Sequence, residues 1–231
     1  MKCIPRSAVY SGGVIHLGSI RKTSIDVDYS FLILVGFFVF SFYDQKQGIQ
    51  YALLWVPVLF LSVLLHELAH AGMIGLFGYG ASQVMLAGLG GVTLNKRVAK
   101  PWHDMVISAA GPAASFVIAF AALALGSRVH DPMFVAFLPL LAEANLVWGF
   151  FNLVPISPLD GGGIVRNFLR IFLRDRTAFV IAIWISFIAG LAVIAFGVVV
   201  KQYMLSFLVA WYLWMNFQQW QYFRTHGFPG D

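Results

Sequence analysis

Charged residues are scarce in this chain of 231 residues. Aspartate, glutamate, lysine and arginine together make up 11% of it, whereas soluble globular domains carry about 25%. Apolar residues account for 60%, and the mean hydropathy is +0.81. This composition leaves no stretch for a sizeable soluble domain and predicts an all-α polytopic membrane protein.

Cysteine occurs only at Cys3, which excludes an internal disulfide. No apolar stretch precedes Cys3, and no apolar run follows the charges of residues 1–13, so we expect neither lipidation nor a signal peptide. The net charge of +5 comes from basic residues that lie between hydrophobic runs instead of forming one stripe. We therefore expect no nucleic-acid partner and interpret the basic excess as a topology signal.

Long hydrophobic runs dominate the rest of the chain and predict about six transmembrane helices, the first of them short. With six spans both termini share one side, and if that side is cytoplasmic, 12 of the 15 basic residues lie inside. The positive-inside rule favours this orientation, so we expect both termini to be cytoplasmic. The runs cover residues 29–43, 51–77, 105–125, 133–153, 178–200 and 203–220.

The second run contains the sequence HELAH at residues 66–70. Residues four apart share a helical face, so His66 and His70 can bind one metal ion while Glu67 takes a proton from an attacking water. From the composition, chance alone gives this pattern in about one such chain in a thousand. A pair of structural histidines on a soluble core helix is the alternative, but it does not explain the length of the apolar run. The motif therefore predicts a zinc site, in the half of the span nearer the cytoplasm.

A catalytic zinc site usually has a third protein ligand. The candidate is Asp160, in NLVPISPLDGGG at 152–163, because the fourth span runs in the same direction as the second and ends at a similar depth. Pro155 and Pro158 break the helix, and the three glycines permit a sharp reversal. The alternative is that Asp160 caps the next predicted helix, at 164–173.

Between the second and third runs lies ASQVMLAGLGGVTL, at residues 81–94. It is too short to span the membrane as a helix and too apolar for a solvated loop. Its glycines permit a tight turn, so it predicts a re-entrant β-hairpin near the metal site, covered by protein or lining a water-filled cavity. A kinked continuation of the helix is the alternative. Residues 20–28 show partial alternation and predict a short strand or extended segment at the membrane surface.

Together these motifs resemble those of the site-2 protease family of intramembrane zinc metalloproteases. The resemblance rests on HELAH within a hydrophobic run, GGVTL at 90–94, Ala-Gly-Pro at 110–112 and FNLVPISPLDGG at 151–162, and it covers about residues 18–173. It implies a three-helix catalytic core with added helices. It also implies one Zn²⁺ per chain, with Glu67 as general base and with three ligands: His66, His70 and Asp160.

The resemblance further implies residues that bind the substrate. Asn152, eight residues before Asp160, is expected to hold the substrate backbone or the oxyanion. Asn145 lies two turns earlier on the same helical face and either extends this surface or joins helices. The hairpin segment is similar to the family's edge strand, which can pair with an unwound substrate. Its contributing residues are Gly90, Gly91 and Val92.

We accordingly expect an N-terminal surface segment at 1–28, a membrane-embedded protease domain at 29–220 with a catalytic core at about 51–173, and a C-terminal tail at 221–231. No stretch is long enough for the PDZ or CBS domain that many family members carry, so a minimal form is expected. The predicted function is hydrolysis of a peptide bond within or near the transmembrane segment of a membrane protein, as in regulated intramembrane proteolysis. The resemblance suggests an anti-sigma factor or a signal-peptide remnant as substrate, in a prokaryotic cytoplasmic membrane.

Other functions fit parts of the sequence. A different type of membrane zinc protease would use a Glu as third ligand, and the one spare Glu, Glu143, has no supporting motif; we expect it to be a protonated, hydrogen-bonded helix contact. A metal transporter would show polar residues along several spans, whereas here they gather at one depth. A non-catalytic zinc-binding membrane protein or pseudoprotease would retain the motif without using Glu67.

Overall fold

The computed structural model describes residues 13–43, 48–88, 90–95 and 99–227. The chain divides into two compact units. The first comprises residues 1–98 and 110–149, and the second comprises residues 99–109 and 150–231.

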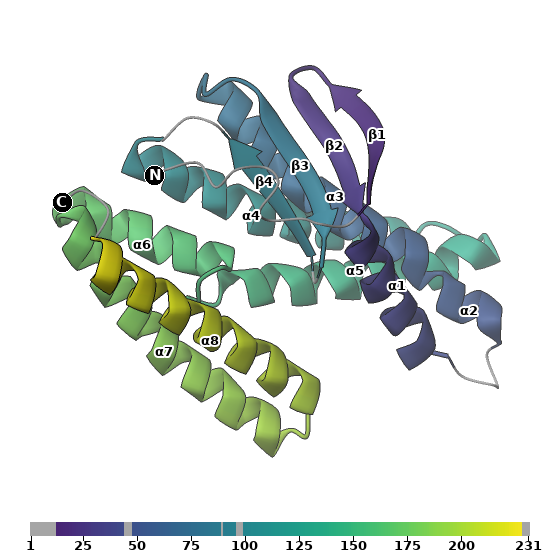
Figure 1. The fold of residues 1–231 in the computed structure, drawn as a ribbon. Coiled ribbons are helices and arrows are strands. Elements are labelled where there is room, and N and C mark those ends of the chain that lie inside the picture. The colour runs from purple at the N-terminus through teal and green to yellow at the C-terminus, as the bar shows by residue number, and fades with distance from the viewer. Residues whose placement is uncertain (1–12, 44–47, 89, 96–98, 228–231) are drawn as a thin grey trace. The chain divides into compact units, whose positions relative to one another are not determined.

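The first unit contains a four-stranded sheet with the strand order β1-β2-β3-β4 (Figure 1). β1 pairs with β2 and β3 with β4 in antiparallel fashion, while β2 and β3 are parallel. The predicted hairpin is thus confirmed as β3 and β4, and its turn contains Gly88 at φ 55°, a conformation that favours glycine. Of the segment predicted as a short strand at 20–28, residues 23–28 form β2, whereas Arg21 and Lys22 form a turn and Ile20 ends β1. The strands are β1 (Val14–Ile20), β2 (Thr23–Asp28), β3 (Ser82–Ala87) and β4 (Gly90–Asn95).

The all-α prediction is therefore corrected to a mostly helical chain with a small sheet. The hairpin is one half of this sheet, because β2 pairs in parallel with β3 through residues such as Ile25 and Val84. A parallel pair needs a crossover connection. The crossover here consists of α1 (Tyr29–Ser41), α2 (Ile49–Leu53) and α3 (Trp55–Leu76).

The core of the first unit lies between these helices and the sheet. α1 begins directly after β2, where the Asp28 carboxylate caps it by accepting a hydrogen bond from the Ser30 backbone N–H at 2.8 Å. α3 packs against α1, β3 and β4. Because the side chains at this interface are apolar and buried, they fix α3 against the sheet. The buried members of this core are Val27, Phe31, Leu34, Val63, Ala71, Val84 and Leu86.

The long helices α4 (Pro101–Gly126) and α5 (Pro132–Leu153) contribute residues to both units. The second unit is completed by α6 (Asp160–Phe172), α7 (Asp175–Val199) and α8 (Tyr203–His226). α7 and α8 run side by side (Figure 1), and Gly190 allows the close contact, since a Cβ there would lie 2.6 Å from Leu213.

Helices occupy all six predicted hydrophobic runs. Among the described residues, four helices are long and apolar enough to cross a membrane, namely 49–76, 101–126, 132–153 and 175–199. α1 is apolar but has only 13 residues, and α8 is not among the four. The chain is therefore a mostly helical protein of membrane character, and the number of six spans stays a prediction.

Candidate metal centre and catalytic site

The HELAH motif lies on α3 in the first unit, as predicted. His66, Glu67 and His70 are all buried, and their ligand atoms lie within 4.8 Å of one another. The two imidazole rings are 4.9 Å apart between centroids. Two imidazoles and a carboxylate at this spacing form a donor set that suits zinc, so the motif forms a site that can hold a metal ion.

Gly111 of α4 lies directly against this histidine pair. A Cβ built there would be 2.3 Å from His70 Nε2 and 2.5 Å from His66 Nε2. The two Nε2 atoms therefore converge on one small volume, which even a methyl group would obstruct. This close approach gives a physical reason for the glycine in the Ala-Gly-Pro motif.

Ser115 holds the other nitrogen of His66. The distance between Ser115 Oγ and His66 Nδ1 is 3.0 Å, and Ser115 is fully buried one turn after Gly111 on α4. When Nδ1–H donates to this hydroxyl, Nε2 presents its lone pair to a metal, which is how partners of metal-binding histidines commonly act. Trp148 of α5 adds an aromatic wall, with its ring edge-on to His66 at 6.4 Å between centroids.

Strand β4 contacts the predicted general base. The Thr93 hydroxyl donates to Glu67, with Oγ1 2.7 Å from Oε2 and 3.0 Å from the Glu67 backbone carbonyl oxygen. A Cβ at Gly91 would lie 2.5 Å from Glu67 Cγ. Gly91 and Thr93 are two residues apart in a strand and so face the same side. The hairpin thus presses one face of its second strand against Glu67.

The other predicted hairpin residues also lie on β4. A Cβ at Gly90 would lie 3.0 Å from the Trp148 ring, and Val92 is paired with Met85 of β3. In the described part of the sheet β4 pairs with β3 only, so it forms an edge of the sheet. Their predicted role in binding a substrate stays a prediction.

Asn145 joins α5 to α3 inside the first unit. Its amide nitrogen donates to Ser62 Oγ and to the Leu141 carbonyl oxygen, both at 2.8 Å. Ser62 lies one turn before His66, so this bond braces the metal-binding helix, and a further role of Asn145 in substrate binding stays a prediction. Glu143 is exposed and makes no hydrogen bond to another described residue, so the expected hydrogen-bonded helix contact is not found.

Asp160 and Asn152 belong to the second unit. Asp160 is the first residue of α6, which begins four residues earlier than predicted, and the N-cap position is taken by Leu159. Asp160 is therefore not the N-cap of this helix. Asn152 is buried near the end of α5. The assignment of Asp160 as third metal ligand and of Asn152 as a substrate-binding residue stays a prediction.

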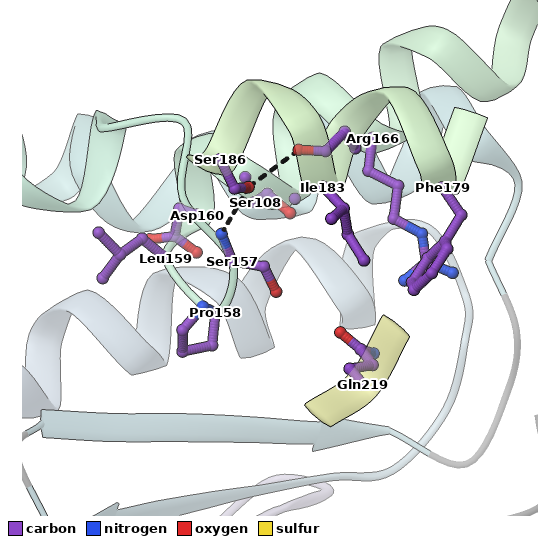
Figure 2. A pocket seen from close by; sticks show the side chains of 13 residues that line it. Ser108, Ser157, Pro158, Leu159, Asp160, Arg166, Phe179, Ile183, Ser186 and Gln219 are labelled. Atoms are coloured by element: carbon purple, nitrogen blue, oxygen red, sulfur yellow. Dashed lines mark hydrogen bonds between the residues drawn. The ribbon is translucent and has the colours of Figure 1, made fainter. Parts of the chain in front are cut away.

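Close packing of the preceding loop explains why glycine follows Asp160. A Cβ at Gly161 would lie 2.2 Å from the Leu153 carbonyl oxygen, and one at Gly162 would lie 2.5 Å from the Ser157 backbone nitrogen. The loop after α5 thus folds closely over the first turn of α6. Its backbone is also tied to α7 and α8: Ser157 N–H donates to Ser186 Oγ at 3.3 Å (Figure 2), and Asn216 Nδ2 donates to the Ser157 carbonyl at 2.8 Å. Asp160 is therefore presented by a tightly packed loop.

Sequence reasoning missed three residues of the first unit's site. All three lie far from the HELAH motif in sequence, and none belongs to a recognised metal-binding or catalytic motif. They are Ser115, Thr93 and Trp148. Thr93 does lie within GGVTL, and Ser115 follows the Ala-Gly-Pro motif at 110–112 by three residues. A search for hydroxyl residues near these two motifs would have found both.

Comparisons with known proteins agree on one family. Residues 126–196 match peptidase family M50, a range that includes Asp160. The chain is 36% identical over 170 residues to the protein Rip3 of Mycobacterium tuberculosis, covering 67% of this chain and 43% of that protein. It is 31% identical over 157 residues to a zinc metalloprotease of Methanocaldococcus jannaschii, covering 67% of this chain and 45% of that protein.

The fold gives the same result. The solved structure of a site-2 protease from Methanocaldococcus jannaschii matches with a TM-score of 0.67 at 26% identity, over 89% of this chain and 94% of that one. The two sequence relatives are longer, and this chain spans less than half of each. These matches confirm the resemblance that the motifs predicted.

Proposed function

Because this chain belongs to the site-2 protease family, we propose that it is an intramembrane zinc metalloendopeptidase. It would hydrolyse a peptide bond within or near a transmembrane segment of another membrane protein. The observation that carries the proposal is the packing of Glu67 between the histidine pair of its own helix and the edge strand β4. A metal-binding scaffold has no need for a carboxylate held in this way beside a sheet edge.

The roles of the residues follow from their chemistry. His66 and His70 would hold one zinc ion per chain, with Asp160 as the proposed third ligand. Zinc, when bound, supplies a Lewis acid that polarises the scissile carbonyl and makes the attacking water more acidic. Glu67 takes the proton from this water and later delivers it to the leaving amine. Thr93 holds the Glu67 carboxylate in place for both transfers.

The edge strand β4 supports a role in presenting the substrate. A transmembrane helix hides its carbonyl groups in its own hydrogen bonds, so it must unwind before water can attack. An extended segment could then add to the free side of β4 by main-chain hydrogen bonds, next to Gly91 and Val92. Asn152, and Asn145 if it reaches the same surface, would hold the substrate backbone or the oxyanion.

The substrate class and location are part of the same proposal. The four long apolar helices support a multi-pass membrane protein. The proposed six spans and cytoplasmic termini rest on the six hydrophobic runs and on the distribution of basic residues, and the proposed prokaryotic cytoplasmic membrane rests on the family resemblance. The substrate would be a membrane-anchored protein such as an anti-sigma factor or a signal-peptide remnant, cleaved in regulated intramembrane proteolysis.

The test compares wild type with Glu67→Gln during co-expression with single-span substrate candidates. Glu67→Gln keeps the size of the side chain but removes the base, so we expect full zinc content and no cleavage. Immunoblotting follows the cleaved fragment, and mass spectrometry of the purified protein follows zinc. Equal cleavage by both proteins would exclude the proposed mechanism. Zinc uptake into vesicles that is the same for both, with no cleavage by either, would indicate a transporter.

A further inference from the structure

A polar cavity in the second unit lies beside the loop that ends at Asp160 (Figure 2). Its volume is about 140 Å³, which corresponds to roughly four or five water molecules at liquid density. A carboxylate-bearing side chain fits a space of this size. The polar residues on its wall are Ser108, Ser157, Asp160, Arg166, Ser186 and Gln219.

Arg166 brings a positive charge to this cavity, and no carboxylate among the described residues forms an ion pair with it. Its guanidinium lies over the Phe179 ring, 5.4 Å from the centroid, and its Nε is buried with no hydrogen-bond partner among the described residues. The charges of the Asp104 and Asp175 carboxylates act on Arg166 from a distance, but their ion pairs are made with Arg170, at 3.8 and 2.9 Å. Burial of a charged group is costly unless the charge is paired. Arg166 is therefore suited to pair with an anion brought by a ligand.

The neutral groups near Arg166 add further hydrogen-bond donors. The hydroxyls of Ser108 and Ser157 and the side-chain amide of Gln219 have no hydrogen-bond partner within the described part of the chain. The Ser186 hydroxyl, in contrast, already accepts from Ser157 N–H and donates to a carbonyl of its own helix. The Ser108 hydroxyl stays accessible because residue 163 is glycine: a Cβ atom at Gly163 would lie 2.9 Å from Ser108 Oγ. A guanidinium with two hydroxyls and an amide suits the acceptor oxygens of a carboxylate.

A second cavity, of about 230 Å³, continues from the first. The two share Ser157, Pro158 and Gln219, and the second extends to Met215 and Asn216 on α8. A small free anion would need only the cavity at Arg166. In a peptide ligand, the residues next to the acidic one also carry side chains. One of these side chains can occupy the second cavity, which is lined in part by Met215. The pair of cavities therefore favours a peptide as ligand.

We propose that the cavity at Arg166 is a side-chain pocket for an acidic residue of the peptide substrate. This inference rests on the proposed function, because Asp160, the proposed third zinc ligand, lines the same cavity. The carboxylate of a substrate Asp or Glu would pair with Arg166 and accept from Ser108, Ser157 or Gln219. Cleavage would then be selective for sequences with an acidic residue at one fixed position relative to the scissile bond.

The first experiment uses the full chain in detergent and a single-span substrate whose cleavage site has been mapped by mass spectrometry. Asp, Asn, Leu and Lys are placed in turn at each position flanking that site. We expect Asp to be favoured over the nearly isosteric Asn at one position by roughly 10- to 100-fold in kcat/KM, because hydrogen bonds to a charged group contribute that much. Arg166→Gln should abolish the preference, so that the Asp and Asn substrates are cleaved at similar rates.

Two further variants separate recognition from folding. Ser108→Ala removes one donor without touching the charge, and we expect a smaller loss of the Asp preference. Arg174→Gln is the matched control. Arg174 is an exposed arginine just after α6, the helix that carries Arg166, so this variant should leave the preference unchanged. Equal slowing of the Asp and Asn substrates by Arg166→Gln, or no Asp preference at any position in wild type, would overturn the inference.

A binding assay distinguishes failure of this inference from failure of the proposed function. In Glu67→Gln protein, which should not turn over, a fluorescent peptide containing Asp should bind more tightly than its Asn counterpart, and Arg166→Gln should remove the difference. If that holds while wild type cleaves nothing, the pocket stands and the protease proposal fails. Inorganic phosphate and phosphatidylglycerol vesicles are tested as competitors. If they bind in a way that depends on Arg166, but do not displace the Asp peptide more readily than the Asn peptide, the peptide carboxylate does not occupy the pocket. The pocket is then a phosphate site and the inference is wrong.

Discussion

Thr93 and Glu67 form a direct hydrogen bond between the edge strand β4 and the helix that carries the metal-binding histidines. Thr93 Oγ1 is 2.7 Å from Glu67 Oε2, and the two residues are 26 positions apart in the sequence. The position of the proposed general base is therefore set by the same strand that is proposed to receive the substrate.

The first prediction concerns the Thr93 hydroxyl. Thr93→Val keeps the shape of the side chain but removes the donor to Glu67, and Glu67 is then free to turn away from the attacking water. We expect kcat to fall about tenfold or more, since a hydrogen bond to a charged group contributes about 1.5–3 kcal/mol. Zinc content should not change, and Thr93→Ser should restore most of the rate. A rate equal to wild type in Thr93→Val would show that the bond has no part in catalysis.

The second prediction concerns Gly111. Gly111→Ala places a methyl group 2.3 and 2.5 Å from the two Nε2 atoms, so we expect loss of most of the bound zinc, measured by mass spectrometry on purified protein. Gly126→Ala is the control on the same helix, because its Cβ would meet only Leu138 at 3.9 Å. Normal zinc in Gly111→Ala would mean that the metal does not bind through these atoms.

The third prediction tests Asp160, the proposed third zinc ligand, which belongs to the second unit. We expect Asp160→Ala and His66→Ala each to lose zinc, while the membrane-extracted proteins still elute as single species. Ser157→Ala provides a control in the same loop, since its backbone bonds to α7 and α8 do not use the side chain. Full zinc occupancy in Asp160→Ala would remove Asp160 from the ligand set and call for another third ligand.

The fourth prediction is topological. A reporter fused after Asp231 and one inserted into the loop at 126–131 should report opposite sides of the membrane, with the C-terminal reporter cytoplasmic. The basis is the 12-to-3 distribution of basic residues across six spans. The same side for both reporters would contradict six spans. It would also remove the depth argument that first pointed to Asp160.

Local periodicity explains what the sequence predicted well. A helix brings residues four apart onto one face, so HELAH sufficed to place His66 and His70 together. Glycine clusters and a short apolar stretch sufficed for the β3–β4 hairpin. In both cases the paired residues lie within 13 positions of each other, and the local backbone geometry determines which side chains meet.

Long-range pairing explains what was missed. Strand β2 meets β3 through pairs such as Ile25 with Val84, across a crossover of three helices, and no local pattern specifies that partner. The same holds for Ser115, whose contact with His66 spans 49 positions. The start of α6 was misplaced because Gly161 and Gly162 disfavour a helix locally, whereas tight packing against the preceding loop requires them there.

Alternation along β4 gives the strand two distinct faces. Gly91 and Thr93 face Glu67, and a shift of the strand by a single position would exchange the faces. One residue inserted within β4 ahead of Thr93 would bring a residue with no hydroxyl to Glu67, while both histidines and their helix stayed intact. Such a protein would keep its metal ligands, yet its kcat would fall at least as far as that of Thr93→Val. Length variation in this short hairpin is therefore a route by which a metal-binding but weakly active homologue can arise, and a metal assay alone would not recognise it.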